Sequence, residues 1–514
     1  MSRHLLILVV LIAGGGASAQ TLEKIYYDGV DADGNLTGGY IMAERPVLTP
    51  HVQTTSGNFV SVIDNGDPAN RIDLVCVGDG YLATELDLYA GHVDTAMTGM
   101  FAQEPYRTYV NLFNVHRVDV VSNDSGVDND PVQGIYRNTA MDMAYWCNGV
   151  ERLLCVNVTL ANLQAAAAPD VDQVFAIANS TKYGGAGYTS SELATFSGGN
   201  FQAVDLALHE MGHSLGDLAD EYDYGGYAVY SGPEPVERNV STLDADAMSL
   251  LGAKWAPWLG DPGLGFGELV DTYEGAYYSQ YGIYRPTATS KMRALGQPFN
   301  LPSLEGLILQ FYSIVDPIDA HTPTGSVLAG TEVMWVDPVD PVDHPLDIQW
   351  FLDGDPIVGA VGDVLDLGVL GLTTGPHDLQ VTVTDNTELV RDETARASLM
   401  TQTVAWSIEV DYLSAVTGDP TGAALTLLDN VPNPFNPSTT VRFTLPAPGR
   451  VRAAVYDTRG RLVARLADEA LDAGVFSYDW HGTDTFGRAL PSGTYFCRLT
   501  TPSTTLIRKM SLLR

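Results

Sequence analysis

Basic residues are scarce in this sequence. Its 514 residues include 27 lysines and arginines against 63 aspartates and glutamates, so the formal net charge is −36 at pH 7. Proteins bind nucleic acids and anionic membranes through lysine and arginine side chains that neutralise phosphate. The charge therefore argues against both as partners, and it favours a well-solvated surface.

Long apolar runs are scarce too. The one long run, residues 5–13, follows the basic residue Arg3 and precedes the small residues 17–19, which is the order of a secretory signal peptide with its cleavage site. We expect residues 1–19 to be such a signal and the protein to be secreted or held at the cell surface. No later run reaches the ~20 apolar residues of a membrane-spanning helix, so no transmembrane segment is expected after signal removal.

Cysteine occurs only four times, at positions 76, 147, 155 and 497. None of these cysteines has the spacing of a zinc finger, which argues against structural zinc held by cysteine. Export permits disulfides, and Cys147 and Cys155 are close enough in sequence to close a small loop. Cys76 stands in an apolar strand and Cys497 near the far end of the chain, so we expect both to be buried thiols.

The segment that carries chemistry is His209-Glu210-Met211-Gly212-His213. On a helix, the two histidines are four positions apart and lie on one face. Both imidazoles can then reach one zinc ion, with Glu210 beside the water that the ion binds. Zinc lowers the pKa of that water, and a carboxylate can take its proton during attack on a carbonyl. The motif therefore predicts a zinc hydrolase, in the first place a peptidase.

The surroundings of the motif support a helix. Residues 204–208 form an apolar run, which places the histidines where a buried helix should be. Gly216 is expected to adopt the left-handed conformation that ends a helix and turns the chain back. A third metal ligand is expected just past this glycine.

The longer run H-E-x-G-H-x-x-G-x-L-x-D-E-Y, residues 209–222, resembles the zinc signature of the IgA-peptidase-type metallopeptidases, the igalysin branch of the metzincins. Other segments resemble that family in the same order along the chain. They are IDLV (72–75), GDGY (78–81), EPY (104–106), NLFNV (111–115), SGVD (125–128), YGG (183–185), YRPT (284–287) and SKMR (290–293). The resemblance covers residues 70–315, about half of the chain.

The resemblance implies a site with Zn²⁺ as cofactor, but the sequence departs from the metzincin pattern at the third ligand. The usual position holds Ala219, which cannot bind a metal. The adjacent Asp220 is the best substitute, and Glu221 and Asp217 are weaker candidates. With His209 and His213, Asp220 completes the expected metal ligands.

The same resemblance assigns roles to three other residues. Glu210 is the expected catalytic base. Met292 is the expected Met-turn methionine, which forms an apolar floor beneath the metal without binding it; the alternative is an ordinary core methionine. Tyr222 is expected to pack the chain after the third ligand; the alternative is a hydrogen bond near the site.

Patterning along residues 70–215 predicts alternating strands and helices. Strands are expected at residues 72–77, 112–120 and 173–179, with helices at residues 84–101 and at the motif. This order favours an α/β or α+β catalytic unit around a mixed sheet.

Beyond residue 320 the pattern changes to short alternating strands, at residues 346–354, 377–386 and 404–410, which is typical of an immunoglobulin-like sandwich. The last segment carries NPFNPSTT (433–440), VYDTRGR (455–461) and PSGTYF (491–496). It resembles the C-terminal β-sandwich domains of type IX secretion and the FlgD-type immunoglobulin-like fold. The resemblance implies the outer-membrane secretion machinery as a partner of this domain; the alternative is a small β module without that role.

We thus expect a multidomain protein: an α/β (α+β) metzincin-like zinc peptidase domain followed by two β-sandwich, immunoglobulin-like domains. The expected parts are a signal peptide (1–19), a short β-rich segment (20–68), the catalytic domain (69–320), an Ig-like domain (321–412), a linker (413–425) and the C-terminal domain (426–514). The expected function is an exported zinc endopeptidase acting on protein or peptide. Two alternatives stay open: a surface adhesion or glycan-binding protein with an inactive peptidase domain, and a zinc amidase acting on cell-wall peptide.

Overall fold

The structure is a computed structural model, and it describes the chain apart from residues 1–21, 31–35, 45–58, 224–227, 264, 267, 325–327, 330–332, 411–424, 429, 458–460, 486–487, 502–504 and 514. The expected signal peptide and nearly all of the expected linker lie outside the described residues. The chain forms two compact units. One contains Met1–Thr324, Met334–Leu365 and Leu379–Trp406, and the other contains Gly325–Val333, Asp366–Asp378 and Ser407–Arg514.

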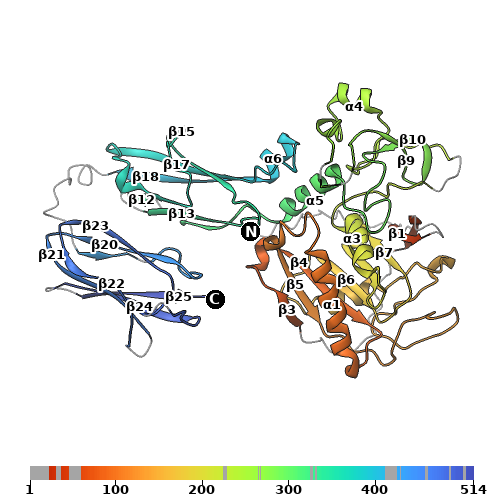
Figure 1. Cartoon of the computed structure of the whole chain (residues 1–514), viewed down its shortest axis with the longest axis horizontal. Helices are drawn as coiled ribbons and strands as arrows, with labels where there is room; N and C mark the ends of the chain where they lie inside the picture. Colours follow the sequence, from red (N-terminus) through yellow and green to blue (C-terminus); the bar gives the residue numbers. More distant parts are fainter. Residues whose placement is uncertain are drawn as a thin grey trace, which may run out of the picture. The chain divides into compact units, whose positions relative to one another are not determined.

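An eight-stranded sheet organises the first unit, in the order β2-β1-β7-β8-β6-β4-β5-β3 (Figure 1). Its strands are β1 (Leu22–Val30), β2 (Leu36–Glu44), β3 (Phe59–Ile63), β4 (Ile72–Asp79), β5 (Phe113–Val118), β6 (Gln173–Ala178), β7 (Gly185–Tyr188) and β8 (Leu193–Ser197). The four middle strands, β8, β6, β4 and β5, run parallel. Antiparallel strands continue the sheet on both sides, β3 at one and β7, β1 and β2 at the other. The expected mixed sheet is confirmed.

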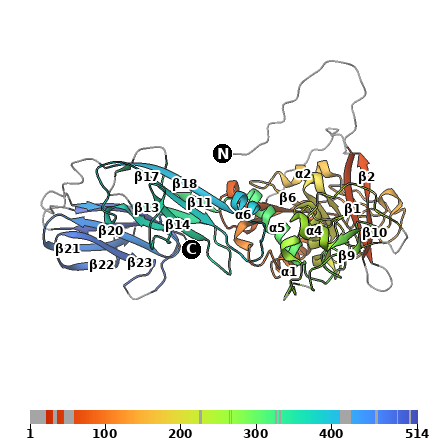
Figure 2. The same ribbon diagram turned by 90° about the horizontal axis from the view of Figure 1, so that it is seen from above.

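Alternate side chains of the central strand β4 enter two separate cores. Leu74 and Cys76 belong to the core that contains helices α1 (Leu86–Met100), α3 (Ala203–Ser214) and α5 (Leu301–Ile314). Val75 and Val77 belong to the core that contains helix α2 (Val158–Ala165). Figure 2 shows α2 on the opposite side of the sheet from α1. Because both faces are covered, the middle of β4, residues 74–77, is a continuous apolar run.

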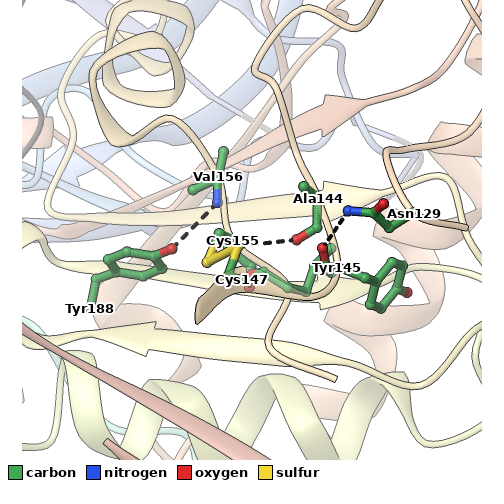
Figure 3. The surroundings of a disulfide bond; sticks show 9 residues. Asn129, Ala144, Tyr145, Cys147, Cys155, Val156 and Tyr188 are labelled. Atoms are coloured by element: carbon green, nitrogen blue, oxygen red, sulfur yellow. Dashed lines mark hydrogen bonds between the residues drawn. A yellow bond between two sulfur atoms is a disulfide. The ribbon is translucent and has the colours of Figure 1, made fainter. Parts of the chain in front are cut away.

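The α2 side of the sheet holds the expected disulfide, Cys147–Cys155 (Figure 3). Ala144 and Cys155 exchange backbone hydrogen bonds of 3.0 and 2.9 Å across the loop that the disulfide closes. The backbone N–H of Val156 donates to the hydroxyl of Tyr188 at 3.3 Å. The disulfide loop is therefore attached to the end of β7, the strand beside helix α3. The other two cysteines are free and buried, as predicted.

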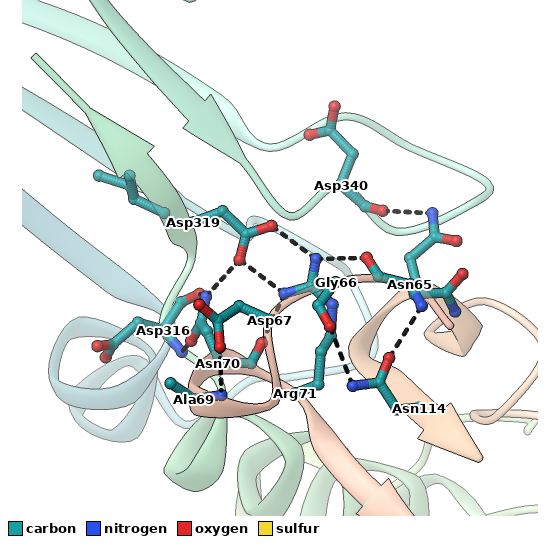
Figure 4. Close-up of polar contacts among 12 residues, drawn as sticks. Asn65, Gly66, Asp67, Ala69, Asn70, Arg71, Asn114, Asp316, Asp319 and Asp340 are labelled. Carbon is teal, nitrogen blue, oxygen red and sulfur yellow. Dashed lines mark hydrogen bonds and ion pairs between the residues drawn. The ribbon is translucent and has the colours of Figure 1, made fainter. Parts of the chain in front are cut away.

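A guanidinium joins the start of β4 to the segment that follows helix α5 and leaves the α/β domain (Figure 4). Arg71 donates from both Nη atoms to the two carboxylate oxygens of Asp319, each at 2.6 Å, and Asp319 stands in strand β11 (Ile318–His321). Asn70 donates to Asp319 as well, at 2.7 Å. Planar two-point pairing of this kind is among the stronger polar contacts in proteins, so the chain is firmly held where the two expected domains meet.

Beyond β11 the chain is mostly antiparallel β. The sheets are ordered β11-β13-β16, β12-β18-β17-β14-β15, β19-β20-β23 and β22-β21-β24-β25. Their strands are β12 (Leu328–Ala329), β13 (Val333–Pro338), β14 (Asp347–Leu352), β15 (Asp355–Pro356), β16 (Val364–Asp366), β17 (Gly375–Thr384), β18 (Thr401–Val410), β19 (Thr426–Leu427), β20 (Thr439–Leu445), β21 (Gly449–Asp457), β22 (Leu462–Leu471), β23 (Gly474–Trp480), β24 (Gly493–Thr500) and β25 (Thr505–Leu512). Small β-sheet domains consistent with immunoglobulin-like sandwiches thus follow the α/β domain, as predicted.

The remaining α-helices and strands of the described residues are α4 (Ala245–Leu251), β9 (Tyr273–Ala276), β10 (Ser279–Arg285) and α6 (Glu393–Leu399). The strands β9 and β10 pair with each other in a two-stranded sheet, and α6 lies between β17 and β18 in the chain. Among the described residues, every helix is too short or too polar to cross a membrane.

Candidate metal centre

Helix α3 carries both histidines of the motif, and its buried face includes Leu206 and Leu208. Gly212 stands between the two histidines, at the point where another segment approaches the helix. A Cβ atom at position 212 would come within 2.7 Å of the Met292 sulfur. Met292 is buried against this turn of α3, which is where an apolar floor beneath the histidines is expected.

Backbone carbonyl groups orient the two imidazoles. Nδ1 of His209 lies 2.9 Å from the Lys291 oxygen, and Nδ1 of His213 lies 2.7 Å from the Leu218 oxygen. A carbonyl oxygen has no proton to donate, so each Nδ1 carries the proton and donates it. Each Nε2 keeps its lone pair, which is the form in which a neutral histidine binds a metal.

The Nε2 atoms of both histidines lie close to one carboxylate oxygen of Asp220. The Nε2 atoms of His209 and His213 are 3.1 Å apart, and Oδ1 of Asp220 lies 3.2 Å from each. No hydrogen bond to this oxygen is present in the described part of the chain. Three acceptor atoms so close together in a buried place repel one another unless a cation lies among them.

The spacing fits a tetrahedral metal ion. Bonds of ~2.0–2.1 Å from zinc in a tetrahedral site place neighbouring ligand atoms about 3.3 Å apart. The observed separations of 3.1–3.2 Å are close to that value. These three side chains could therefore hold one metal ion.

The other two acidic candidates have different partners. Glu221 accepts a hydrogen bond of 2.6 Å from the hydroxyl of Ser290, and Asp217 accepts one of 2.8 Å from the side-chain amide of Gln310. The structure therefore groups Asp220, and neither of these two residues, with the histidines.

The left-handed turn after the helix lies one residue later than expected. Asp217 has a φ of 49°, while Gly216 is not among the residues with positive φ, so that prediction was wrong. Gly216 is needed for space, because a Cβ atom there would come 2.7 Å from the Gly212 oxygen. Aspartate, like asparagine, adopts the left-handed backbone conformation more readily than most residues. The turn still brings Asp220 beside the histidines of the helix.

Electrostatics keep Asp220 in its charged form. Burial alone would raise the pKa of Asp220, but His213 and His209 hold that pKa below its usual value when a histidine is protonated at Nε2, and a metal cation in the same place would act in the same direction. The carboxylate is therefore ionised at neutral pH and can bind a cation.

Glu210 lies between α3 and strand β7. Its side chain is fully buried. A Cβ atom on Gly187 of β7 would come 2.8 Å from Oε2 of Glu210, so the carboxylate fits only because this strand position is a glycine. One residue after His209 on the same helix, it stands on the sheet side of the histidine pair.

Two tyrosines that were not identified from the sequence border the group. The hydroxyl of Tyr278 donates to Oδ2 of Asp220. The ring of Tyr26, from β1, stacks on the imidazole of His213 with centroids 4.0 Å apart and planes within 5°. No motif or spacing marks either tyrosine, because strand pairing and a distant turn bring them to the site. Tyr222 is buried and its ring lies 5.6 Å from that of Tyr278, which agrees with a packing role.

A buried group of two histidines and a carboxylate, with a glutamate on the same helix, is the arrangement of a metal-dependent hydrolase site. Residues 60–263 match the family model of IgA Peptidase M64, a family of metallopeptidases. The match supports a peptidase. The matched segment contains the H-E-x-x-H motif and Asp220, and it ends before Tyr278 and Met292. Residues 435–504 match the FlgD Ig-like domain.

Comparison with solved structures gave weaker similarities. Dimeric latent PorU from Porphyromonas gingivalis is 18% identical over 38% of this chain and 20% of its own, with a TM-score of 0.22. FLGD from P. aeruginosa is 28% identical over 14% of this chain and 59% of its own, with a TM-score of 0.13. The chain thus spans less than two thirds of either protein, and we base no inference on TM-scores of this size. No curated protein matches the chain.

Proposed function

We propose that the protein is an exported zinc-dependent endopeptidase of the metzincin type, within or close to the igalysin branch. His209, His213 and Asp220 hold Zn²⁺, and Glu210 is the catalytic base. The observation that carries this proposal is the group of three buried acceptor atoms 3.1–3.2 Å apart. The family match over residues 60–263 supports the peptidase activity.

A bound zinc ion would supply a Lewis acid that acidifies water and polarises the scissile carbonyl. Glu210 takes a proton from the attacking water while the water oxygen bonds to the carbonyl carbon. It then gives the proton to the leaving amine nitrogen as the C–N bond breaks. Lys291 and Leu218 hold the imidazoles through their backbone oxygens, and these hydrogen bonds fix which nitrogen faces the metal.

The remaining parts of the chain receive roles in the same proposal. Residues 1–19 direct export, and residues 69–320 form the catalytic domain that acts on protein or peptide. The Ig-like domain at residues 321–412 and the linker at 413–425 lead to the domain at 426–514. That last domain contacts the outer-membrane secretion machinery, and the FlgD Ig-like match supports its β-sandwich type.

The alternative of an inactive adhesion protein is less well supported. A decayed site would have lost a ligand or the base, whereas the three ligand candidates here are grouped and Glu210 is present beside them. A zinc amidase acting on cell-wall peptide shares the same residues and differs only in its substrate, so substrate profiling separates it from the peptidase.

The test is hydrolysis of a mixed protein and peptide library by the zinc-loaded full chain and by Glu210→Gln. Glutamine keeps the size of the side chain but cannot accept the water proton, so we expect cleavage to fall at least about 100-fold while zinc content is unchanged. Glu388→Gln, at an exposed position, is the matched control and keeps full activity.

Cleavage that is equal in the wild type and Glu210→Gln would remove Glu210 from the mechanism. No cleavage by either protein with zinc bound would contradict the peptidase proposal, and cleavage confined to cell-wall peptides would favour the amidase.

A further inference from the structure

The proposed catalytic residues are closed off in this structure. His209, Glu210, His213 and Asp220 are each 0% exposed. A scissile carbonyl must come within about 3 Å of both the metal and the base, which a fully buried group does not permit. A segment beside the site therefore has to move before a polypeptide can bind.

The hairpin formed by the paired strands β1 and β2, residues 22–30 and 36–44, lies directly against the site. Tyr26 in β1 covers one face of the His213 ring, at a centroid distance of 4.0 Å. The same residue pairs with Gly187 in β7, the position where a Cβ atom would come 2.8 Å from Oε2 of Glu210. One hairpin residue thus contacts a ligand ring and occupies the strand edge next to the base.

The tip of Lys24 holds the hairpin onto the body of the protein. Its ammonium donates to the Tyr277 hydroxyl at 2.9 Å, and it lies 3.8 Å from a carboxylate oxygen of Glu237. It also lies over the rings of Tyr26 and Tyr40, at 4.3 and 4.7 Å from their centroids. Such cation–π contacts add to the ion pair. This attachment is polar and local, and the hairpin also places Ile25 in the apolar core on the α2 side of the sheet.

The second hairpin strand reaches the other side of the site. The ring of Tyr40 in β2 lies 5.6 Å from that of Tyr278, whose hydroxyl binds Asp220. Both strands of the hairpin therefore stand over groups that contact the proposed metal ligands.

The pairing of the hairpin is unequal on its two sides. β1 pairs with β2 through nine residue pairs, from Leu22 with Glu44 to Val30 with Leu36. It pairs with β7 through only two, Ile25 with Tyr188 and Tyr26 with Gly187. The hairpin can therefore separate from β7 as a unit while it keeps its own hydrogen bonds.

Strand β7 is suited to pair with another extended chain once the hairpin has left. Ala186 and Gly187 have almost no side chain to obstruct an approaching backbone, while Gly185 is already bridged to Leu153. An exposed strand edge of this kind accepts an extended peptide as an added strand. Such a peptide would lie where β1 lies now, next to Glu210 and His213.

We propose that the paired strands β1 and β2, residues 22–30 and 36–44, are an autoinhibitory cover, which occupies the edge of β7 and must be displaced before an extended polypeptide substrate binds there. This inference rests on the proposed peptidase function for its substrate. The displacement itself needs no catalysis, so the two proposals can fail separately.

The first test compares Tyr26→Ala with wild type in the zinc-loaded full chain. Loss of a stacked ring pair weakens the hairpin by on the order of 0.5–1.5 kcal/mol, so kcat/KM on an unfolded polypeptide such as reduced casein rises by up to about tenfold. Met42→Ala, at an exposed position of β2, is the control and changes nothing. A kcat/KM that is unchanged or lower in Tyr26→Ala, at equal zinc content, would overturn the proposal.

The second test is hydrogen exchange of the same full-length proteins. We expect Tyr26→Ala to speed amide exchange in residues 22–30, 36–44 and 185–188, by up to about tenfold from the same ring-pair loss, and to leave β6 unchanged. Equal exchange in β7 would show that the hairpin is a fixed part of the sheet. If no variant cleaves casein but exchange in β7 rises, the cover exists and the peptidase proposal fails.

Discussion

The backbone oxygen of Lys291 accepts a hydrogen bond from Nδ1 of His209 at 2.9 Å, while the ammonium of the same lysine pairs with Asp205 at 2.6 Å. Asp205 lies one turn before His209 on helix α3. Lys291 therefore connects the segment of Met292 to the helix at two points and fixes the orientation of a proposed metal ligand. The lysine side chain is fully buried, so the ion pair is shielded from solvent on that side.

We expect Lys291→Met to weaken both folding and metal binding. The substitution keeps the length of the side chain but removes the charge, and it leaves Asp205 without its partner. A hydrogen bond to a charged group contributes about 1.5–3 kcal/mol. Without the ion pair, the segment that presents the Lys291 backbone oxygen to His209 is held less firmly, so metal affinity falls by up to about 10-fold. Urea denaturation and a zinc competition titration measure the two effects. Lys509→Met, at an exposed lysine, is the control, and wild-type zinc affinity in Lys291→Met would refute the role given to this residue.

Asp385 joins the peptidase-like region to the first Ig-like domain. This buried carboxylate accepts hydrogen bonds of 2.8 and 2.9 Å from the hydroxyls of Tyr109 and Tyr312, and it contacts Nε2 of His344 at 2.8 Å. The two tyrosines belong to the peptidase-like region, and the aspartate follows β17. The first Ig-like domain is therefore attached through a buried polar network.

We expect Asp385→Ala to lower the free energy of unfolding by about 3 kcal/mol, because the two tyrosine hydroxyls lose their acceptor in a buried place. Thermal and urea denaturation measure the change. Asp355→Ala, at an exposed position of β15, should stay within about 0.5 kcal/mol of wild type. Equal effects of the two substitutions would show that the network adds nothing to stability.

Asp172 makes stability depend on pH in the acid range. Burial raises its pKa from 3.8 to about 6, with repulsion from Asp73 adding to the rise. The folded protein thus keeps a proton that the unfolded chain has lost. The resulting stabilisation is complete below about pH 4 and disappears as the pH rises through about 6.

Asp172→Asn removes this dependence, because the amide is neutral at every pH and its oxygen can still accept the N–H of Asp73, a bond of 2.8 Å. Relative to wild type, the variant should gain up to about 2 kcal/mol on going from pH 4.5 to pH 7.5. Urea denaturation of both proteins at the two pH values measures the gain. An offset between the proteins that is the same at both values would contradict the shifted pKa.

Much of the fold was predictable because its signals are local. The apolar run in β4 and the alternation in β14, β17 and β18 follow from burial on two faces or on one, and all four strands form where they were expected. Helix α5 was missed because it is buried on nearly every side. A helix that is apolar all round has no polar stripe to reveal its period.

The candidate site was predictable only as far as the motif reaches. The spacing of His209, Glu210 and His213 is a property of one helix and can be read from the sequence. The choice of Asp220 over its acidic neighbours depends on how the chain turns at Asp217. Tyr26 and Tyr278 arrive through a strand pairing and a turn far away in the chain, and no local pattern encodes either.

The zinc content of the purified full chain, measured together with matched variants, tests the central claim most directly. We predict one zinc ion per chain in wild type and in Asp217→Asn, where asparagine keeps both the left-handed turn and an acceptor for Gln310. Asp220→Asn should bind zinc at least about 10-fold more weakly, because an amide oxygen is a poor ligand for zinc. Full zinc affinity in Asp220→Asn, or its loss in Asp217→Asn alone, would contradict the metal centre described here.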